Sequence, residues 1–297
     1  MWQPEPGWVH LSDGRGPLSQ GTWRVDNAWI VKRVGLPDES ADRAYHQPSS
    51  PSYWRRELEF ALADPPIQGL IAPQVRRVDE DDEGYTLWTG LQTRSVVDGD
   101  RMAVALAEFA VSAVAPEPWH AVGHLRAKIG HAETHDGWPT LARTTVADLT
   151  DALWSARGSC LRRLESLARV PIHGDLVRAN VLGVSAGAVV AVDWASFGWG
   201  APGEDLGLYA ASASTDLDRL VYEYVGGLPD GLATARDVSW AARTVAAFTV
   251  IGRAEWALSR VAPGEGALAN KYRHPAVAPY LRALQNQIPA IEAVLES

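Results

Sequence analysis

The chain of 297 residues is 46% hydrophobic and 21% charged, the composition of an ordinary globular protein whose core can support more than one lobe. Its formal net charge of −9 argues against non-specific nucleic-acid binding, which requires clustered Lys and Arg. Its single cysteine, Cys160, excludes an intrachain disulfide and fits the reducing environment of the cytoplasm, where we expect the protein to reside.

Two β-hairpins are predicted within the first ninety residues. The first turns at Asp26-Asn27, because Asx pairs between apolar runs favour tight turns. The second turns within the acidic stretch 79–84. The four strands are expected over residues 22–25, 28–34, 75–78 and 85–88.

One helix is predicted between the two hairpins. Ser52 is a plausible N-cap, and apolar side chains recur at helical spacing from Trp54 until Pro65 ends the segment. The preceding stretch, 36–52, is polar and rich in Pro and Ser, so we interpret it as an exposed loop or insertion.

From residue 100 onward the apolar periodicity is mostly helical. Asp237 is a candidate helix cap, and Gly158 is expected to break or bend the helix that contains it. Two short apolar runs, 179–182 and 188–192, predict a small buried hairpin. Helices are expected over residues 102–114, 144–167, 205–213, 237–261 and 275–295.

A strand-rich part followed by a helix-rich part predicts an α+β protein of two lobes, with a cleft at their interface. We expect an N-lobe over residues 1–91 and a C-lobe over residues 92–297. We expect no secretory signal, because the first six residues lack a basic and an apolar region. No apolar run reaches the roughly 18 residues of a membrane span, so no membrane partner is expected.

The most informative motif runs from His173 through Gly174, Asp175 and Asn180 to Asp193. Phosphoryl transfer requires a carboxylate that accepts the proton of the attacking hydroxyl, and Asp175 is the candidate. Amide and carboxylate oxygens are the hard ligands that Mg²⁺ prefers, which makes Asn180 and Asp193 candidate metal ligands. His173 is expected to have a structural role beneath the loop.

This motif, with Asp193-Trp194 and Gly203-Glu204-Asp205-Leu206, resembles the aminoglycoside phosphotransferase and choline kinase-like superfamily, which has the protein-kinase-like fold. The resemblance extends over most of the chain and implies a role for each matching residue. Asp175 matches the catalytic base, and Asn180 and Asp193 match the Mg²⁺ ligands. Asp205 matches a buried aspartate that braces the catalytic loop. Lys32 matches the lysine that binds the nucleotide phosphates, and Glu57 matches the helix glutamate that pairs with that lysine.

The rest of the nucleotide site is less clearly marked. A glycine-containing stretch, 14–21, is expected to cover the phosphates, with Ser19 and Gly21 as nucleotide-binding residues. Its spacing is irregular for such a loop. The adenine is expected against backbone groups of Thr89 to Leu91. ATP is the expected donor, and the sequence leaves GTP open.

Only eleven residues separate Asp193 from Asp205, which leaves no room for the long activation segment with which a protein kinase docks a peptide. Gly174 also stands where many protein kinases have an arginine that binds a regulatory phosphate. We therefore expect a small alcohol as the acceptor, and a protein that is a monomer or a homodimer.

The identity of the acceptor is open. The resemblance favours a cationic molecule, such as an aminoglycoside-like or other antibiotic or an amino sugar, and a role in antibiotic resistance; the alternative is a metabolite of the choline, sugar or homoserine type. The polar insertion 36–52 is a candidate lid. Candidate acceptor contacts are the acidic residues Glu204, Asp216, Asp218 and Glu255 and the ring walls Trp194, Trp199 and Trp256.

Two other classes of protein compete with this interpretation. The irregular glycine stretch is compatible with a nucleotide-binding pseudokinase that lacks catalysis. A hydrolase metal site would need further histidine ligands, for which the nearby set is His120, His124, His131 and His135, but Gly123 and Gly130 interrupt that segment.

Overall fold

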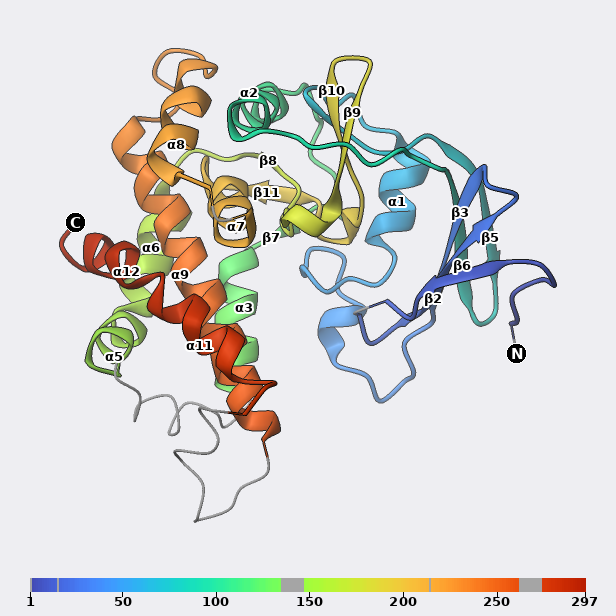
Figure 1. Cartoon of the computed structure of the whole chain (residues 1–297), viewed down its shortest axis with the longest axis horizontal. Helices are drawn as coiled ribbons and strands as arrows, with labels where there is room; N and C mark the ends of the chain where they lie inside the picture. Colours follow the sequence, from blue (N-terminus) through green and yellow to red (C-terminus); the bar gives the residue numbers. More distant parts are fainter. Residues whose placement is uncertain (1, 15, 135–146, 214, 262–273) are drawn as a thin grey trace.

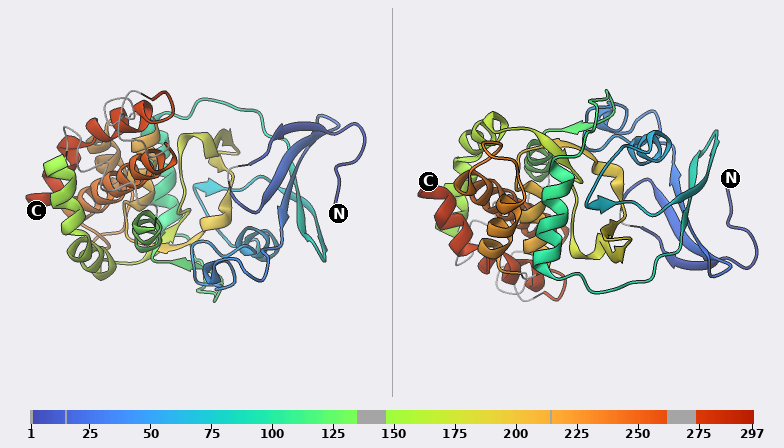
Figure 2. Two further views of the ribbon diagram at one scale, coloured as in Figure 1. Left: turned by 90° about the horizontal axis from the view of Figure 1, so that it is seen from below. Right: turned by 90° about the horizontal axis from the view of Figure 1, so that it is seen from above.

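A strand-rich lobe and a helical lobe lie side by side in the structure, a computed structural model that describes residues 2–14, 16–134, 147–213, 215–261 and 274–297 (Figure 1). The N-terminus lies at the outer end of the strand-rich lobe, and the C-terminus lies on the far side of the helices. Two further views show the same separation from above and below (Figure 2). The expected two-lobed α+β fold is confirmed.

The N-terminal lobe is built on a five-stranded antiparallel sheet of order β1-β2-β3-β6-β5. Both expected hairpins are present within it. Asp26 and Asn27 form the first turn with a positive φ of 50° at each residue, which Asp and Asn tolerate better than most side chains. The strands are β1 Val9–Ser12, β2 Ser19–Val25, β3 Trp29–Gly35, β5 Val75–Asp81 and β6 Gly84–Gly90.

Helix α1, Arg56–Ala63, packs against this sheet and begins three residues later than expected. Ser52 is therefore not its N-cap. The reason is the Arg56 side chain, which holds residues 48–51 folded back on the helix start and so prevents them from entering it. Asp64 ends the helix in a left-handed conformation, one residue before the first proline. Within the preceding insertion, the 3₁₀ turn η1 spans Arg43–Tyr45.

Two small three-stranded sheets hold the segment that carries the motif. One pairs β4 Leu70–Ile71 and β9 Val181–Ser185 with β10 Ala188–Ala191, so the expected buried hairpin is present. The other pairs β7 Ala121–Val122 and β8 Val170–Ile172 with β11 Gly198–Gly200. Short 3₁₀ turns, η2 Arg178–Asn180 and η3 Trp194–Ser196, follow the catalytic loop and Asp193.

Helices form the rest of the second lobe. They are α2 Gly99–Ala110, α3 His124–Glu133, α5 Ala147–Ser155, α6 Arg157–Ser166, α7 Glu204–Ala213, α8 Leu217–Gly226, α9 Ala235–Arg260, α11 Ala278–Gln285 and α12 Ile288–Leu295. None of these described helices combines the length and the apolar character that crossing a membrane requires.

Three details differ from expectation. The helix expected over 144–167 is two helices that meet at Ala156 rather than at Gly158, and residues 144–146 lie outside the described part. The helix expected over 275–295 is also divided, at Asn286-Gln287. Thr234, not Asp237, caps α9: its hydroxyl accepts the Asp237 N–H at 3.1 Å and donates to the Asp237 carboxylate at 2.7 Å.

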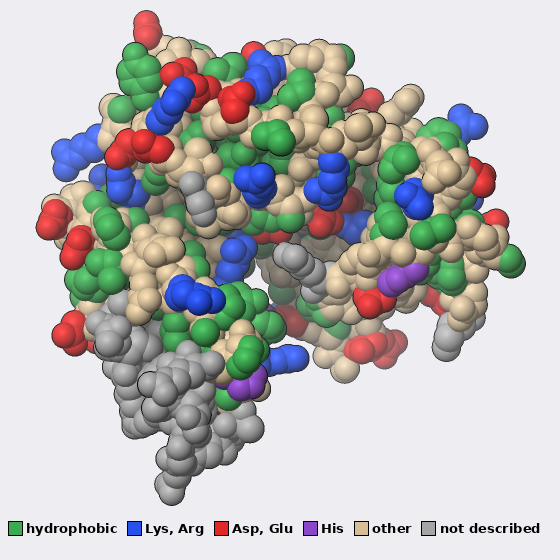
Figure 3. Space-filling model, in the orientation of Figure 1, with side chains coloured by type: hydrophobic (Ala, Val, Ile, Leu, Met, Phe, Trp, Pro, Cys, Tyr) green, Lys and Arg blue, Asp and Glu red, His purple; other side chains and the backbone are tan. Residues whose placement is uncertain are grey.

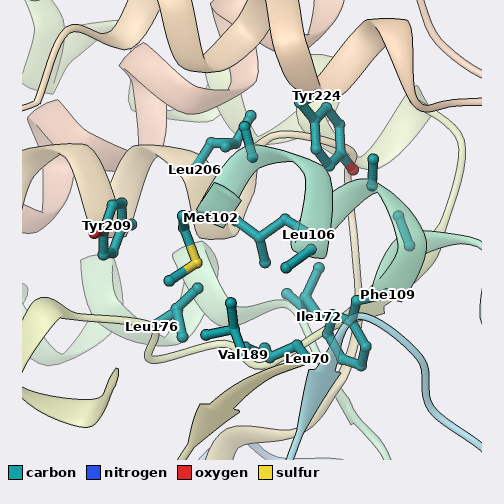
Figure 4. Packing of buried hydrophobic residues seen from close by; sticks show 14 of the residues in the cluster. Leu70, Met102, Leu106, Phe109, Ile172, Leu176, Val189, Leu206, Tyr209 and Tyr224 are labelled. Carbon is teal, nitrogen blue, oxygen red and sulfur yellow. The ribbon is translucent and has the colours of Figure 1, made fainter. Parts of the chain in front are cut away.

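The larger of the two C-lobe cores surrounds α2, one face of which presents Met102, Leu106 and Phe109 (Figure 4). These side chains contact Leu70 from β4 and Val189 from β10, so the first sheet packs directly on the helix. All five side chains are buried, and those of Leu70, Met102 and Val189 are completely buried. The catalytic loop therefore rests on a rigid, close-packed base.

Candidate active site

Asp205 anchors the catalytic loop from below. Its two carboxylate oxygens accept the backbone N–H groups of His173 at 2.7 Å and of Gly174 at 3.0 Å. Burial raises the pKa of the Asp205 carboxyl, against the opposing effects of His173 and of the two N–H donors. Two charge-assisted hydrogen bonds from one buried side chain fix the backbone immediately before Asp175.

His173 connects this loop to the strand end that carries Asp193. Its Nδ1 accepts the Asp175 N–H at 3.3 Å, and its Nε2 lies 3.0 Å from the Val192 carbonyl oxygen. The two ring nitrogens thus hold the loop backbone on one side and the end of the strand on the other. The ring is fully buried against Trp194, at a centroid distance of 4.7 Å. The side chain thus lies inside the protein, away from any acceptor.

Asn180 and Asp193 converge on one side of the loop. The Asn180 side-chain amide donates to the Asp175 carbonyl at 2.9 Å, which leaves its Oδ1 as an available acceptor. The Val192 N–H donates to the Asn180 carbonyl at 2.9 Å, so the residue before Asp193 is tied to Asn180. Asp193 adopts a left-handed conformation, with φ 67°, and its side chain is half exposed. One amide oxygen and one carboxylate fit Mg²⁺, which is commonly held by one or two carboxylates together with substrate phosphates.

Lys32 is the point where three elements meet. Its ammonium on β3 donates to Glu57 Oε2 on α1 at 2.7 Å and also pairs with Asp193, which belongs to the second lobe. Burial of the ammonium lowers its pKa, but the two carboxylates outweigh that effect and hold the pKa of Lys32 above its usual value. Lys32 is therefore a permanent cation, placed beside Asp193, one of the two candidate Mg²⁺ ligands.

The glycine-containing stretch runs from the connection between β1 and β2 into the start of β2, which holds Ser19 and Gly21. Its Gly14 has a φ of 75°, and a Cβ there would lie 1.9 Å from Ser19 Oγ, so only glycine fits. Gly21 is similarly restricted, by the ring of Trp23 at 2.5 Å. Ser19 Oγ is buried and has no hydrogen-bond partner among the described residues. A buried hydroxyl without a partner in this loop is consistent with a role in binding phosphate.

At the connection between the lobes, two backbone amides are already used. The Leu91 N–H donates to the Ala28 carbonyl at 2.8 Å, and the Gly90 N–H donates to the Gln74 carbonyl at 2.9 Å. Thr89 lies inside β6, between Ile30 and Val75. β6 therefore extends two residues beyond the strand expected over 85–88, and the contact of the adenine with backbone groups of Thr89 to Leu91 stays a prediction.

Several candidate acceptor contacts are turned away from solvent. Trp194 is 2% exposed and stacks on Phe60 at 4.5 Å, so it belongs to the core rather than to a substrate wall. Glu255 is fully buried. Glu204 is 5% exposed, and its Oε1 accepts the Ala201 N–H at 2.8 Å. These three expectations are corrected, because the side chains are engaged inside the fold.

The remaining candidates lie apart from one another. Asp216 caps α8, and Asp218 pairs with Arg243. Trp199 is partly buried and donates to His120 Nδ1 at 3.0 Å. Trp256, 39% exposed, packs edge-on against Tyr280. Four other tryptophans gather at the N-lobe sheet: Trp2, Trp8 and Trp23 are in mutual ring contact, and Trp8 also contacts Trp88.

The histidines proposed as metal ligands also have other roles. His120 Nδ1 accepts hydrogen bonds from Trp199 Nε1 and from the Glu117 N–H, at 3.0 and 3.1 Å. His124 Nε2 lies 2.7 Å from the Ser196 carbonyl oxygen, and His131 is exposed. His135 lies outside the described residues. Within the described ranges, no group of three or more His, Cys, Asp or Glu is arranged to hold a metal ion.

Arg56 is a structural residue of the site that the sequence did not single out. Its buried guanidinium donates to five backbone carbonyls, those of Pro48, Ser50, Pro51, Trp119 and Ala195. Because Arg56 is adjacent to Glu57, these hydrogen bonds connect the start of α1 with the end of the insertion and with the second lobe. The Val122 N–H also donates to the Ser49 carbonyl at 3.1 Å. This end of the insertion is therefore anchored rather than free to act as a lid.

Between the lobes the surface is hollowed, and Lys and Arg side chains lie on the C-lobe side of the hollow (Figure 3). The first lobe carries a lysine–glutamate pair, and a braced Asp–Asn–Asp loop lies at the interface with the second lobe. This arrangement defines a small-molecule kinase with a protein-kinase-like fold. The sequence matches the phosphotransferase enzyme family, APH, over residues 18–238, and the chain belongs to that family. It is an enzyme that transfers a phosphoryl group to a hydroxyl group.

Solved structures of similar fold include several small-molecule kinases. A choline/ethanolamine kinase family protein from Mesorhizobium loti is 18% identical, with a TM-score of 0.57 over 97% of this chain and 92% of that one. A mutant aminoglycoside 2′-phosphotransferase in complex with GDP is 14% identical, with a TM-score of 0.61 over 95% and 91%. Spectinomycin phosphotransferase in complex with ADP and spectinomycin is 10% identical, with a TM-score of 0.59 over 97% and 92%. No curated protein sequence gives a significant match.

Proposed function

We propose that the protein uses ATP and Mg²⁺ to phosphorylate a hydroxyl group of a small molecule. The observation that carries this proposal is the network that links Asp175, Asn180 and Asp193 of the second lobe with the Lys32–Glu57 pair of the first. The Asp175 carboxylate forms no hydrogen bond with the described residues, although it is partly buried, so it is available to an incoming hydroxyl.

Each group then has a defined task. Asp175 accepts the proton of the acceptor hydroxyl as its oxygen forms a bond to the γ-phosphorus, while the bond from that phosphorus to the β-phosphate oxygen breaks and ADP leaves. Lys32 binds the α- and β-phosphates, and Glu57 holds it in place. Asn180 and Asp193 would hold Mg²⁺, which would supply charge neutralisation on the transferring group.

The acceptor belongs to the hydroxylated small molecules on which kinases of this family act. The resemblance favours an aminoglycoside-like or other antibiotic or an amino sugar, and a metabolite alcohol is the alternative. The solved structures named for an aminoglycoside, for spectinomycin and for choline or ethanolamine have similar overlap with this chain, so the fold supports both classes equally.

The proposal is tested by replacing Asp175 with Asn, a nearly isosteric change that removes the proton acceptor. We expect ADP release in the presence of an acceptor to fall by at least about 10²-fold, while the affinity for ATP or GTP with Mg²⁺, measured calorimetrically, stays within about threefold. Asp82→Asn is the matched control, because Asp82 is exposed in the turn before β6. Full transfer activity in the Asp175→Asn variant would contradict the assignment.

A pseudokinase is the second candidate, favoured by the irregular glycine stretch. A pseudokinase would bind nucleotide but show no Asp175-dependent release of ADP, whether water or an alcohol is offered as the phosphoryl acceptor. The same experiment therefore separates the two, because only a kinase loses turnover when Asp175 is changed.

A further inference from the structure

Helix α3 presents one face to the catalytic loop. His124, at its start, lies so close to Gly174 that a Cβ on the glycine would be 2.6 Å from His124 Nε2. At the other end, Ala132 packs against α9, where a Cβ built on Gly252 would lie 3.8 Å from the Ala132 side chain. Lys128 is four residues from each, and residues four apart share a helix face. Lys128 therefore lies between the catalytic loop and α9.

The Lys128 side chain is partly buried and has no hydrogen bond or ion pair within the described part of the chain. Burial has the largest effect and lowers the pKa of Lys128. Four charged groups also act on it: Asp175, Glu204 and Asp205 raise this pKa, and Arg253 lowers it. Lys128 is thus near the carboxylate that we assign as the base.

The carboxylates near Lys128 do not use its hydrogen-bond donors. Asp205 is engaged by the backbone of His173 and Gly174, and Glu204 accepts from the Ala201 N–H. An ammonium has three donors, and burying it without partners is costly. The C-lobe therefore contains an ammonium that is close to Asp175 and that, within the described part of the chain, is paired with none of its neighbours.

We propose that Lys128 binds an oxyanion group of the acceptor, so that the molecule phosphorylated beside Asp175 is a hydroxylated carboxylate rather than a polycationic amine. This inference rests on the proposed kinase function, because it assumes that the acceptor hydroxyl lies at Asp175. Arg253 on α9 lies on the same side and adds positive charge there. A polycationic acceptor would instead meet Lys128 with like charge, which disfavours binding.

The test uses three acceptors that share one ring and differ in charge: glucuronate, glucose and glucosamine. Each is titrated calorimetrically into the protein loaded with Mg²⁺ and ADP, and each is assayed for ADP release with Mg²⁺ and ATP. We expect glucuronate to bind at least about tenfold more tightly than glucose, and glucosamine to bind no better than glucose, which corresponds to one charge-assisted hydrogen bond.

Lys128→Met, which keeps the aliphatic stem, should remove the preference for glucuronate, and Lys128→Glu should reverse it in favour of glucosamine. The loss should appear in the KM for glucuronate rather than in the KM for ATP. The matched control is Arg126→Met, since Arg126 lies on another face of the same helix and pairs with Glu165 at 2.6 Å. The thermal midpoint of each variant establishes that it is folded.

The two proposals fail in different ways. Binding of glucuronate that depends on Lys128, without Asp175-dependent release of ADP, would support the oxyanion site and contradict the kinase function. Release of ADP that depends on Asp175, together with equal or tighter binding of glucose or glucosamine, would support the kinase and overturn the oxyanion site. A preference for glucuronate that Lys128→Met leaves intact also overturns it, as does the absence of binding by all three rings.

Discussion

Gly174 lies in direct contact with His124, and this contact explains why the catalytic loop has a glycine before Asp175. A Cβ on Gly174 would lie 2.6 Å from His124 Nε2 and 2.4 Å from the Ser196 carbonyl oxygen. The residue also has a φ of 81°, which L side chains rarely adopt. Burial lowers the pKa of His124 to about 3, so its ring is neutral and hydrogen-bonded to Ser196 at neutral pH.

Gly174→Ala is therefore expected to damage both stability and activity. The added carbon must displace the backbone of residue 196 or the ring of His124, and we expect a loss of about 2 kcal/mol or more in the free energy of unfolding. Because the shift falls next to Asp175, turnover should fall further than stability alone explains. Urea denaturation and ADP release measure the two effects.

The control for this change is Gly130→Ala on the same helix that carries His124. A Cβ at Gly130 meets nothing within 4 Å, so this variant should be as stable as the wild type or gain up to about 1 kcal/mol from helix propensity. Equal losses in the two variants would contradict the steric explanation.

The sequence predicted the parts of the site that are local. The spacing from Asp175 to Asp193 indicated one constellation, and the structure ties the backbone of Asn180 to the residue before Asp193. It did not predict α3, because Gly123 and Gly130 weaken its helical pattern, although packing against α9 is enough to form the helix. Nor could it predict Lys128 near Asp175, since that proximity joins segments separated by more than forty residues.

Burial was the second property that sequence could not supply. Trp194 and Glu255 had the chemistry of substrate contacts, but both side chains lie inside the fold. A lone aromatic or acidic residue has the same pattern on a surface and in a core, so only packing distinguishes the two. Strands of two residues, such as Ala121–Val122, were also missed, because two residues cannot display an alternating pattern.

The Lys32–Glu57 pair makes a prediction about nucleotide binding. Lys32→Met removes the cation that faces Glu57 and Asp193, and we expect kcat/KM for ATP to fall by roughly 10²-fold or more, the scale of one lost electrostatic contact at a transferring phosphoryl group. Glu57→Gln should weaken the same parameter less, because the cation remains. In a double-mutant cycle, the two changes should be strongly non-additive.

The control for this cycle is the Arg55–Glu59 pair, four residues apart on the same helix and partly exposed. A surface pair of this type contributes at most about 1 kcal/mol, and its removal should leave kcat/KM for ATP within about twofold. Additive effects of Lys32→Met and Glu57→Gln would show that the two residues act independently.

Arg56 should be important for stability although it is outside the chemistry. Its guanidinium is the donor for five carbonyls, and burial lowers its pKa to about 10. Arg56→Lys keeps the charge but not the planar fork, so we expect the free energy of unfolding to fall by about 3 kcal/mol. Hydrogen exchange should become faster in residues 46–52 and at the start of α1, whereas Arg55→Lys should change neither measurement.

Glu204 gives a prediction about pH. Burial raises the pKa of its carboxyl to about 7, although the Ala201 N–H opposes this shift. The folded protein therefore holds a proton that the unfolded chain releases near its ordinary value of 4.5, and stability declines as the pH rises from that value towards 7. Glu204→Gln keeps an oxygen acceptor for Ala201 and cannot ionise. The free energy of unfolding of this variant, relative to that of the wild type, should rise by up to about 3 kcal/mol between pH 4.5 and pH 8. Urea denaturation at each pH measures this difference. A difference between the two proteins that is constant with pH would mean that Glu204 is already ionised in the folded state at acidic pH.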